Sequence, residues 1–143
     1  MLKQLLDGVR PDDESNGLAI DYAANSAGDV DSAGVLMQGF LEFLATLHLD
    51  VVDASTTLVF KVQESDDDTT YTDVPDATSG TIAAATANEI RRIHVDWRHP
   101  DRKKYARVRC VVAGSNSADF SVDTLRGNAV GGDISKSASM IEA

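Results

Sequence analysis

The segment Leu58–Val74, with the sequence LVFKVQESDDDTTYTDV, most constrains the fold of this chain. Apolar Leu58, Phe60 and Val62 alternate with the residues between them, which is the period-2 pattern of a strand with one buried face. Seven polar residues, 64–70, follow and are rich in Asp and Thr, which favour turns because their side chains bond nearby backbone groups. An extended pattern then resumes to the end of the segment. The sequence therefore predicts a β-hairpin here.

Further strand-like runs, separated by turn residues, continue on both sides of this hairpin. The expected strands cover residues 18–23, 40–51, 58–64, 89–97, 105–113 and 119–125. The alanine-rich run 81–87 is ambiguous, since alanine also suits helices, and a loop or weak strand is expected. Short strands with turns between them, and no convincing amphipathic helix, predict an all-β protein: an antiparallel β-sandwich or jelly roll with extended polar termini. The expected core comprises Phe43, Leu47, Phe60, Val62, Ile93, Val95, Val108, Val112 and Phe120.

The expected organisation is one globular domain with an extended segment at each end. The chain has 143 residues, of which 43% are hydrophobic, and this suits a single domain with a real core. We expect an extended N-terminal arm over 1–34, a β-sandwich domain over 35–128 and a flexible C-terminal tail over 129–143. The two ends are polar but hold isolated apolar residues, so we expect them to be interaction elements, with candidate contacts at Leu18, Ile20, Ile134, Met140 and Ile141.

Composition argues against several classes of protein. No apolar run approaches the roughly 20 residues that cross a bilayer, and the first 15 residues lack the apolar region of a secretory signal, so no membrane partner is expected. The single cysteine, Cys110, fits synthesis in a reducing cytoplasm. The formal net charge of −10 argues against nucleic acid as a partner.

Charge is distributed unevenly along the chain. Residues 1–90 hold 17 acidic and three basic residues, for a net charge of −14, whereas residues 91–143 hold six acidic and ten basic ones, for a net charge of +4. This asymmetry is either a solvated accident or electrostatic complementarity with a partner or another copy of the chain. Arginines form bidentate pairs with carboxylates at protein contacts. Outward-facing Arg92, Arg107 and Arg109 are therefore the expected interface residues.

Catalytic motifs are missing from the sequence. It has no glycine-rich loop before a helix, no GxSxG and no HExxH. The three histidines, His48, His94 and His99, are expected on the surface rather than around a metal, and Cys110 alternates with apolar residues as a small buried side chain. We expect no enzyme activity, no catalytic residues and no cofactor.

Two other features have a structural and a functional interpretation. The run Asp66–Asp68 lacks the spacing and glycine of a calcium-binding loop, so a solvated hairpin tip is expected and no metal site. Trp97 and Tyr105 flank the turn 98–104 and would form a sugar-binding platform if exposed, but such residues more often seal the edge of a core.

The segment Phe60–Val74, FKVQESDDDTTYTDV, resembles a motif of small virion proteins of tailed bacteriophages. The resemblance extends to the basic segment Lys103–Val108, KKYARV, and to a closing strand that ends in a glycine, Ser121–Gly127. It covers roughly residues 35–128; the two ends match nothing in it, and WRHPDRKKY stands where those proteins usually have a shorter turn.

This resemblance implies a head decoration (cement) protein or another minor capsid protein. Such a protein binds the outer capsid surface of the virion, bridges neighbouring capsomers, and is made in the host bacterial cytoplasm. The implied partners are the major capsid protein and other copies of the same chain. Two alternatives remain open: a receptor- or carbohydrate-binding β-sandwich of a head or tail fibre, and a structural component of the neck or tail. Exposure of Trp97 and Tyr105 would favour the carbohydrate-binding alternative.

Overall fold

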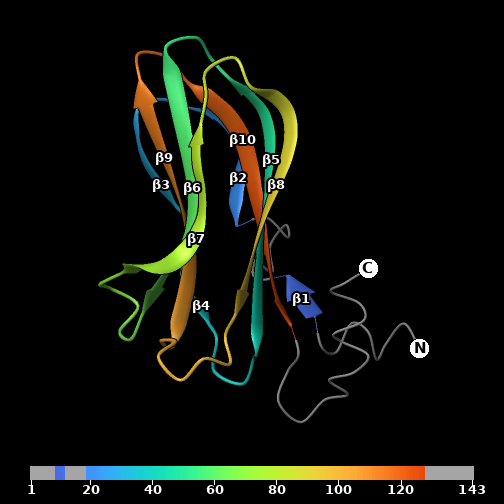
Figure 1. Cartoon of the computed structure of the whole chain (residues 1–143), viewed down its shortest axis with the longest axis vertical. Helices are drawn as coiled ribbons and strands as arrows, with labels where there is room; N and C mark the ends of the chain where they lie inside the picture. Colours follow the sequence, from blue (N-terminus) through green and yellow to red (C-terminus); the bar gives the residue numbers. More distant parts are fainter. Residues whose placement is uncertain (1–8, 12–18, 128–143) are drawn as a thin grey trace, which may run out of the picture.

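The structure is a computed structural model that describes residues 9–11 and 19–127 of the chain. These residues form two antiparallel β-sheets packed face to face (Figure 1), and within them there is no helix that could span a membrane. The strands are β1 (Val9–Pro11), β2 (Ile20–Asn25), β3 (Gly28–Asp31), β4 (Val35–Leu36), β5 (Glu42–Val52), β6 (Thr56–Ser65), β7 (Thr72–Ile82), β8 (Ala87–Asp96), β9 (Tyr105–Gly114) and β10 (Ala118–Gly127). The expectation of an all-β sandwich is confirmed.

The strands divide between the sheets in a way that brings distant parts of the chain together. Sheet A has the order β1-β10-β5-β8, and β2 also pairs with β10. Sheet B has the order β3-β9-β6-β7, and β4 also pairs with β9. The long strands run alternately up and down, so short turns gather at one end of the sandwich (Figure 1). The segments 32–41, 66–71 and 97–104 gather at the other, which we call the loop end.

The core lies between the two sheets and matches the alternation in the sequence. Eight of the nine expected core residues are buried, and the ninth, Ile93, is half-buried at the margin. Phe43, Phe60 and Phe120 are completely buried. Burying a large apolar side chain contributes about 1.5–3 kcal/mol, so these rings are a main source of stability. Trp97 closes the loop end of the core, with its ring centroid 6.0 Å from that of Phe43.

The hairpin expected over Leu58–Val74 is present as β6 and β7. The two strands pair antiparallel, with shifts of register between Val59 and Lys61 and between Lys61 and Gln63. The second strand is longer than expected, because β7 continues to Ile82 and only the turn after it separates it from β8. The ambiguous run 81–87 therefore holds the end of one strand, a turn and the start of the next.

The sandwich begins earlier in the chain than residue 35. β2 pairs with β10 in sheet A and β3 pairs with β9 in sheet B, so part of the segment expected as an arm lies within both sheets. Its polar composition is accommodated because β3 meets the basic strand β9 across an exposed sheet face. Residues 1–8 and 12–18 of that arm, and the tail 129–143, lie outside the described residues.

Candidate functional site

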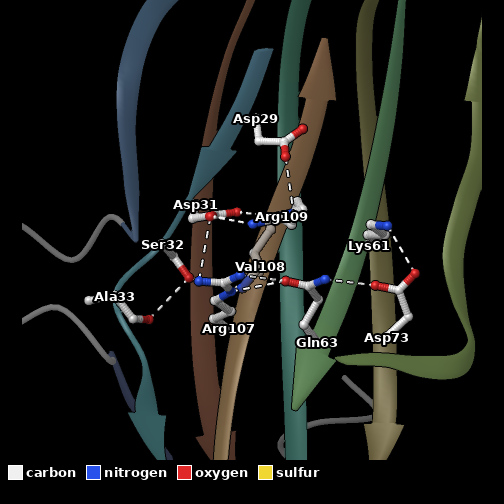
Figure 2. A network of polar contacts seen from close by, with 10 residues as sticks. All are labelled: Asp29, Asp31, Ser32, Ala33, Lys61, Gln63, Asp73, Arg107, Val108 and Arg109. Carbon is white, nitrogen blue, oxygen red and sulfur yellow. Dashed lines mark hydrogen bonds and ion pairs between the residues drawn. The ribbon is translucent and has the colours of Figure 1, made fainter. Parts of the chain in front are cut away.

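The outer face of sheet B carries a connected network of charged and polar side chains (Figure 2). Arg109 on β9 donates from Nε and Nη2 to the two carboxylate oxygens of Asp31 on β3, at 2.7 and 2.8 Å. Its third nitrogen, Nη1, lies 3.2 Å from a carboxylate oxygen of Asp29. A guanidinium that meets a carboxylate through two parallel bonds is the strong geometry for such a pair. All three nitrogens of the Arg109 guanidinium therefore contact acids of the same chain.

Arg107 extends this network from β9 across β6 to β7. Its Nε and Nη2 donate to Oε1 of Gln63 at 3.0 and 2.8 Å, and its Nη1 lies 3.4 Å from Asp31. The Gln63 amide nitrogen donates in turn to Asp73 at 2.7 Å, and the Lys61 ammonium donates to the other oxygen of Asp73 at 2.9 Å. The network thus spans sheet B from β3 to β7 (Figure 2).

The network keeps its carboxylates charged. The hydrogen bonds from Arg109 hold the pKa of Asp31 below its usual value. The hydrogen bonds from Gln63 and then Lys61 hold the pKa of Asp73 below its usual value. Bonds to the ionised form favour that form, so both acids stay negative at neutral pH. The positive charges on this face are therefore largely compensated within the chain.

The three arginines expected to form one interface lie in two different sheets. Arg107 and Arg109 are on β9 in sheet B, whereas Arg92 is on β8 in sheet A, because the segment 97–104 crosses from one sheet to the other. Arg92 is exposed, while the Arg107 and Arg109 side chains are only 16% and 26% exposed. The expectation that the three project from one face is wrong. Part of the charge asymmetry has an internal explanation, because acids of β3 pair with arginines of β9.

The tip of the β6–β7 hairpin is exposed, as expected for Asp66–Asp68. Asp67 is the residue that shapes it: its Oδ1 accepts hydrogen bonds from Ser65 Oγ and from the backbone N–H groups of Thr69 and Thr70, at 2.8–2.9 Å. Led by the backbone bond from Thr70, these bonds lower the pKa of Asp67 to about 2. Asp67 therefore shapes the turn through its Oδ1.

Tyr71 attaches this tip to the body of sheet B. Its hydroxyl donates to Asp68, and the Arg107 guanidinium lies 3.9 Å from the centroid of its ring, a cation–π contact. Burial, and then the bond to Asp68, raise the pKa of the Tyr71 hydroxyl. Gly34 lies directly beneath this arrangement, where a Cβ would overlap Asp68 Oδ1 and Tyr71 Oη.

The basic segment 97–104 is held against the sandwich by buried contacts. Trp97 is 7% exposed, and its indole N–H donates to the carbonyl of Lys103 at 2.8 Å. Glu64 accepts from the backbone N–H of Lys103 at 3.2 Å and lies 3.5 Å from Arg102 in an ion pair whose side chains are 7% and 13% exposed. Tyr105 is half-buried. Trp97 and Tyr105 therefore pack at the edge of the core and do not form an exposed aromatic platform.

The histidines and the cysteine are placed as the alternation predicts. His48 lies 2.7 Å from Asp123 and His94 lies 3.2 Å from Glu42 on the outer side of sheet A, and His99 is exposed at the loop end. Among residues 9–11 and 19–127, no group of His, Cys, Asp and Glu is arranged to hold a metal ion. Cys110 is buried, and this burial raises the pKa of its thiol.

The outer face of sheet A exposes two large apolar side chains, whereas among the described residues sheet B exposes one, Leu36 of β4. Tyr22 on β2 is 58% exposed and Ile90 on β8 is 55% exposed. A shallow hollow of about 320 Å³ lies between them and is floored by His48 and Ser121, which the register places in one row with Ile90. The Tyr22 hydroxyl donates to Asp50 at 2.9 Å. Exposed apolar groups around a hollow are typical of contact surfaces.

The expected contact residues of the chain ends have different outcomes. Ile20 is 8% exposed and belongs to the core, because β2 is paired with β10, so it is not an exposed contact. Leu18, Ile134, Met140 and Ile141 lie outside the described residues. The exposed side chains of Tyr22 and Ile90 were not foreseen. Ile90 is an apolar residue on the polar side of its alternating strand, and this signal was available in the sequence. Tyr22 has the parity of buried Ile20, so alternation alone would place it inward, but the register between β2 and β10 shifts between Ile20 and Ala23.

Known proteins share the fold of this chain but not its sequence. No protein-family model and no curated protein matches it. The PBSX exported protein XepA is similar over 83% of the chain at 17% identity, with a TM-score of 0.57, and the chain spans 36% of that protein's length. A protein of Bacillus endospore appendages, described as disulfide-linked pili, has a TM-score of 0.47 at 15% identity, with 86% and 89% of the two chains covered. The SPBc2 prophage-derived protein YomS has a TM-score of 0.41 at 13% identity, with 82% and 89% covered. The similarity to XepA shows a shared fold.

Proposed function

We propose that the chain is a structural protein of a tailed-phage virion, a decoration protein that binds the outer head surface and stabilises the shell by bridging capsomers. The observation that carries this proposal is the position of the two motifs that resemble phage virion proteins. They lie about 30 residues apart in the sequence, and in the structure they form one unit on sheet B.

Contacts between the two motifs are specific. Gln63 of the first motif accepts two hydrogen bonds from Arg107 of the second, and Arg107 also covers the ring of Tyr71. The two strands that carry them, β6 and β9, are paired throughout. The resemblance therefore follows a structural unit rather than scattered residues, and this supports carrying the function of such proteins over to this chain.

The form and charge of the molecule fit this role. A sandwich in which 23 hydrophobic residues of the described part of the chain are buried is a rigid body that can transmit load between capsomers without chemical activity. The net charge of −10 suits the outside of a capsid better than the inside, where a like-charged protein would be repelled by packaged DNA. XepA, a solved protein that shares this fold, is described as an exported protein of PBSX, which is in keeping with a phage origin.

The outer face of sheet A is the surface we assign to the contact with the major capsid protein. Its exposed Tyr22 and Ile90 offer apolar area, whereas the face of sheet B is closed by its own ion pairs. Binding energy at protein contacts is concentrated in a few aromatic and aliphatic side chains set in pockets. Each bound copy would add such contacts to a shell that must resist the pressure of packaged DNA.

Co-sedimentation with purified phage heads that lack the protein tests this proposal. The wild-type chain should sediment with the heads, and the double variant Tyr22→Ala/Ile90→Ala should bind at least about tenfold more weakly, since hot-spot truncations cost about 1.4 kcal/mol or more. Thr81→Ala, an exposed residue of sheet B, is the matched control and should bind like wild type. Failure of the wild-type chain to bind heads, together with binding to tails or necks, would favour the neck or tail alternative instead.

A further inference from the structure

The open side of the sandwich carries a groove that the contacts described so far do not use. It has a volume of about 590 Å³ and is lined by Val74–Ala77 of β7, Ile93–Asp96 of β8 and side chains of the segment 97–104. β7 and β8 are the last strands of their sheets, so the groove lies between two sheet edges. Val74, Ala77 and Val95, each at most 7% exposed, make its floor apolar.

The groove is open because β7 bends away from β8 at the loop end (Figure 1). Pro75, which has no N–H to donate, and Asp76, whose φ of 62° is in the left-handed region, lie within this stretch of β7. The register with β6 also shifts across this stretch, between Asp73 and Thr78. Bulges and prolines of this kind are typical of edge strands.

The edge of β8 still has hydrogen-bonding capacity along this groove. The backbone N–H of Trp97 donates to the carbonyl of Leu41 on the β5 side at 2.8 Å, which sets the phase of the antiparallel ladder between β5 and β8. Counting back from Trp97, residues Arg92 and His94 direct their backbone groups away from β5. Within the described part of the chain no strand pairs with that edge.

We propose that the carboxyl-terminal segment of the same chain, residues 133–141, binds in this groove as an additional strand on the edge of β8. These residues lie outside the described part of the chain, and the proposal is independent of the phage role. The sequence of this segment has the pattern of a strand. Ile134, Ala138 and Met140 alternate with serines 135, 137 and 139, the pattern of a strand with one apolar side.

The segment that follows β10 is long enough to reach the outer edge of β8 and to run along it. β10 ends at Gly127, which pairs with Glu42, and Glu42 in turn pairs with Asp96 at the end of β8. The chain thus leaves sheet A at the level of the groove. A position beyond β8 is three strand spacings away, about 14 Å, and residues 128–132 can span up to about 17 Å. If residues 133–141 then turn back along the sandwich, they run antiparallel to β8.

The charges of the groove are compatible with this segment. The two arginines of the groove are paired within the chain, Arg98 with Asp96 and Arg102 with Glu64. In this alignment Lys136 shares the inward side with Ile134 and Ala138, and the exposed carboxylate of Asp76 in the groove can receive it. Attachment to the same chain also favours the contact, because a short linker gives an effective concentration in the millimolar range. A free strand edge is otherwise a site for unwanted pairing between copies, and a bound tail would cover it.

Amide hydrogen exchange of the full-length chain tests the proposal. In the wild type the amides of Arg92 and His94 should be protected, and in Ile134→Asp/Met140→Asp their exchange should be at least about tenfold faster, because an aspartate cannot enter the apolar groove. Ser135→Asp/Ser139→Asp adds the same charge to the other side of the segment and should keep the protection. The amide of Val108, in the middle of sheet B, should exchange equally slowly in all three proteins and so reports that the fold is intact.

Two results would overturn the proposal. The first is rapid exchange at Arg92 and His94 in the wild type, or protection that is equal in both double variants. The second is protection that rises with protein concentration together with a dimer in sedimentation velocity, because the tail of a second copy would then be the occupant.

Discussion

The pair formed by Asp31 and Arg109 can be tested quantitatively by a double-mutant cycle. The sequence alone indicated Arg109 as a contact for a partner, but the structure gives it two bonds to Asp31, at 2.7 and 2.8 Å. Replacing Arg109 should therefore lower the stability of the isolated chain. The cycle consists of the wild type, Asp31→Asn, Arg109→Met and the double variant, with the free energy of unfolding measured by urea denaturation.

The expected coupling follows from distance and exposure. Two unit charges about 4 Å apart attract with about 1 kcal/mol in water and about 4 kcal/mol at an effective dielectric constant of 20. The side chains are 26% and 29% exposed, which is between these limits, and holding two side chains in one geometry costs part of the gain. We expect a coupling of about 1–2 kcal/mol. Each single variant should melt a few degrees lower, since 1 kcal/mol corresponds to roughly 2–4 °C in a protein of this size.

Arg92→Met is the matched control for this cycle. Arg92 is an exposed arginine in a strand, and no hydrogen bond or ion pair of its side chain is found among the described residues, so its replacement should change stability by less than about 0.5 kcal/mol. The coupling should also weaken in 1 M salt, where the Debye length is about 3 Å. A coupling near zero, or an effect of Arg92→Met as large as that of Arg109→Met, would refute the assignment of Arg109 to an internal ion pair.

Three further predictions concern stability. Phe60→Ala should lower the free energy of unfolding by about 3–5 kcal/mol, because Phe60 is completely buried; a loss below about 1 kcal/mol in a urea titration would show that the core is not packed as described. Glu64→Ala should cost about 3–5 kcal/mol, because it leaves Arg102 buried without its ion-pair partner, whereas Glu64→Gln keeps an acceptor for Lys103 and should cost less; equal losses in thermal melts would contradict this. Finally, the pKa values of Asp31 and Asp73 are lowered in the folded state. The two carboxylates therefore contribute fully to the free energy of unfolding above the pKa of an aspartate in the unfolded chain, about 3.9, and this contribution is lost as the pH falls through their lower pKa values in the folded state. The urea midpoint should therefore fall below about pH 4, and fall less in Asp31→Asn; an identical acid profile for both proteins would argue against the network.

Local patterns in the sequence were sufficient to predict the long strands, because one face of each long strand is buried. Phe43, Phe60 and Phe120 stand in alternating runs, and alternation fixes which side faces the core. Cys110 and the exposed Asp66–Asp68 tip follow from the same reasoning. The hairpin was predictable because its turn residues are adjacent in sequence.

Pairing between distant strands could not be derived in this way. The sequence does not reveal that β3 lies beside β9, so Asp31 was assigned to an arm and Arg109 to a partner. The same applies to Arg92, whose strand belongs to the other sheet although it is only 15 residues from Arg107. Charge along a chain indicates partners only once the topology has paired the strands, and strands with few apolar residues, such as β3, give the weakest signal of all.

The position of the chain in the virus particle is the most direct test of the account. A cryo-electron microscopy density map of intact particles of the phage that encodes the chain should contain the two-sheet sandwich on the outer head surface, in copies that follow the symmetry of the shell. Sheet A, with Tyr22 and Ile90, should face the major capsid protein. Density for the sandwich confined to the neck, the tail or a fibre, or its absence from the particle, would contradict the proposed role.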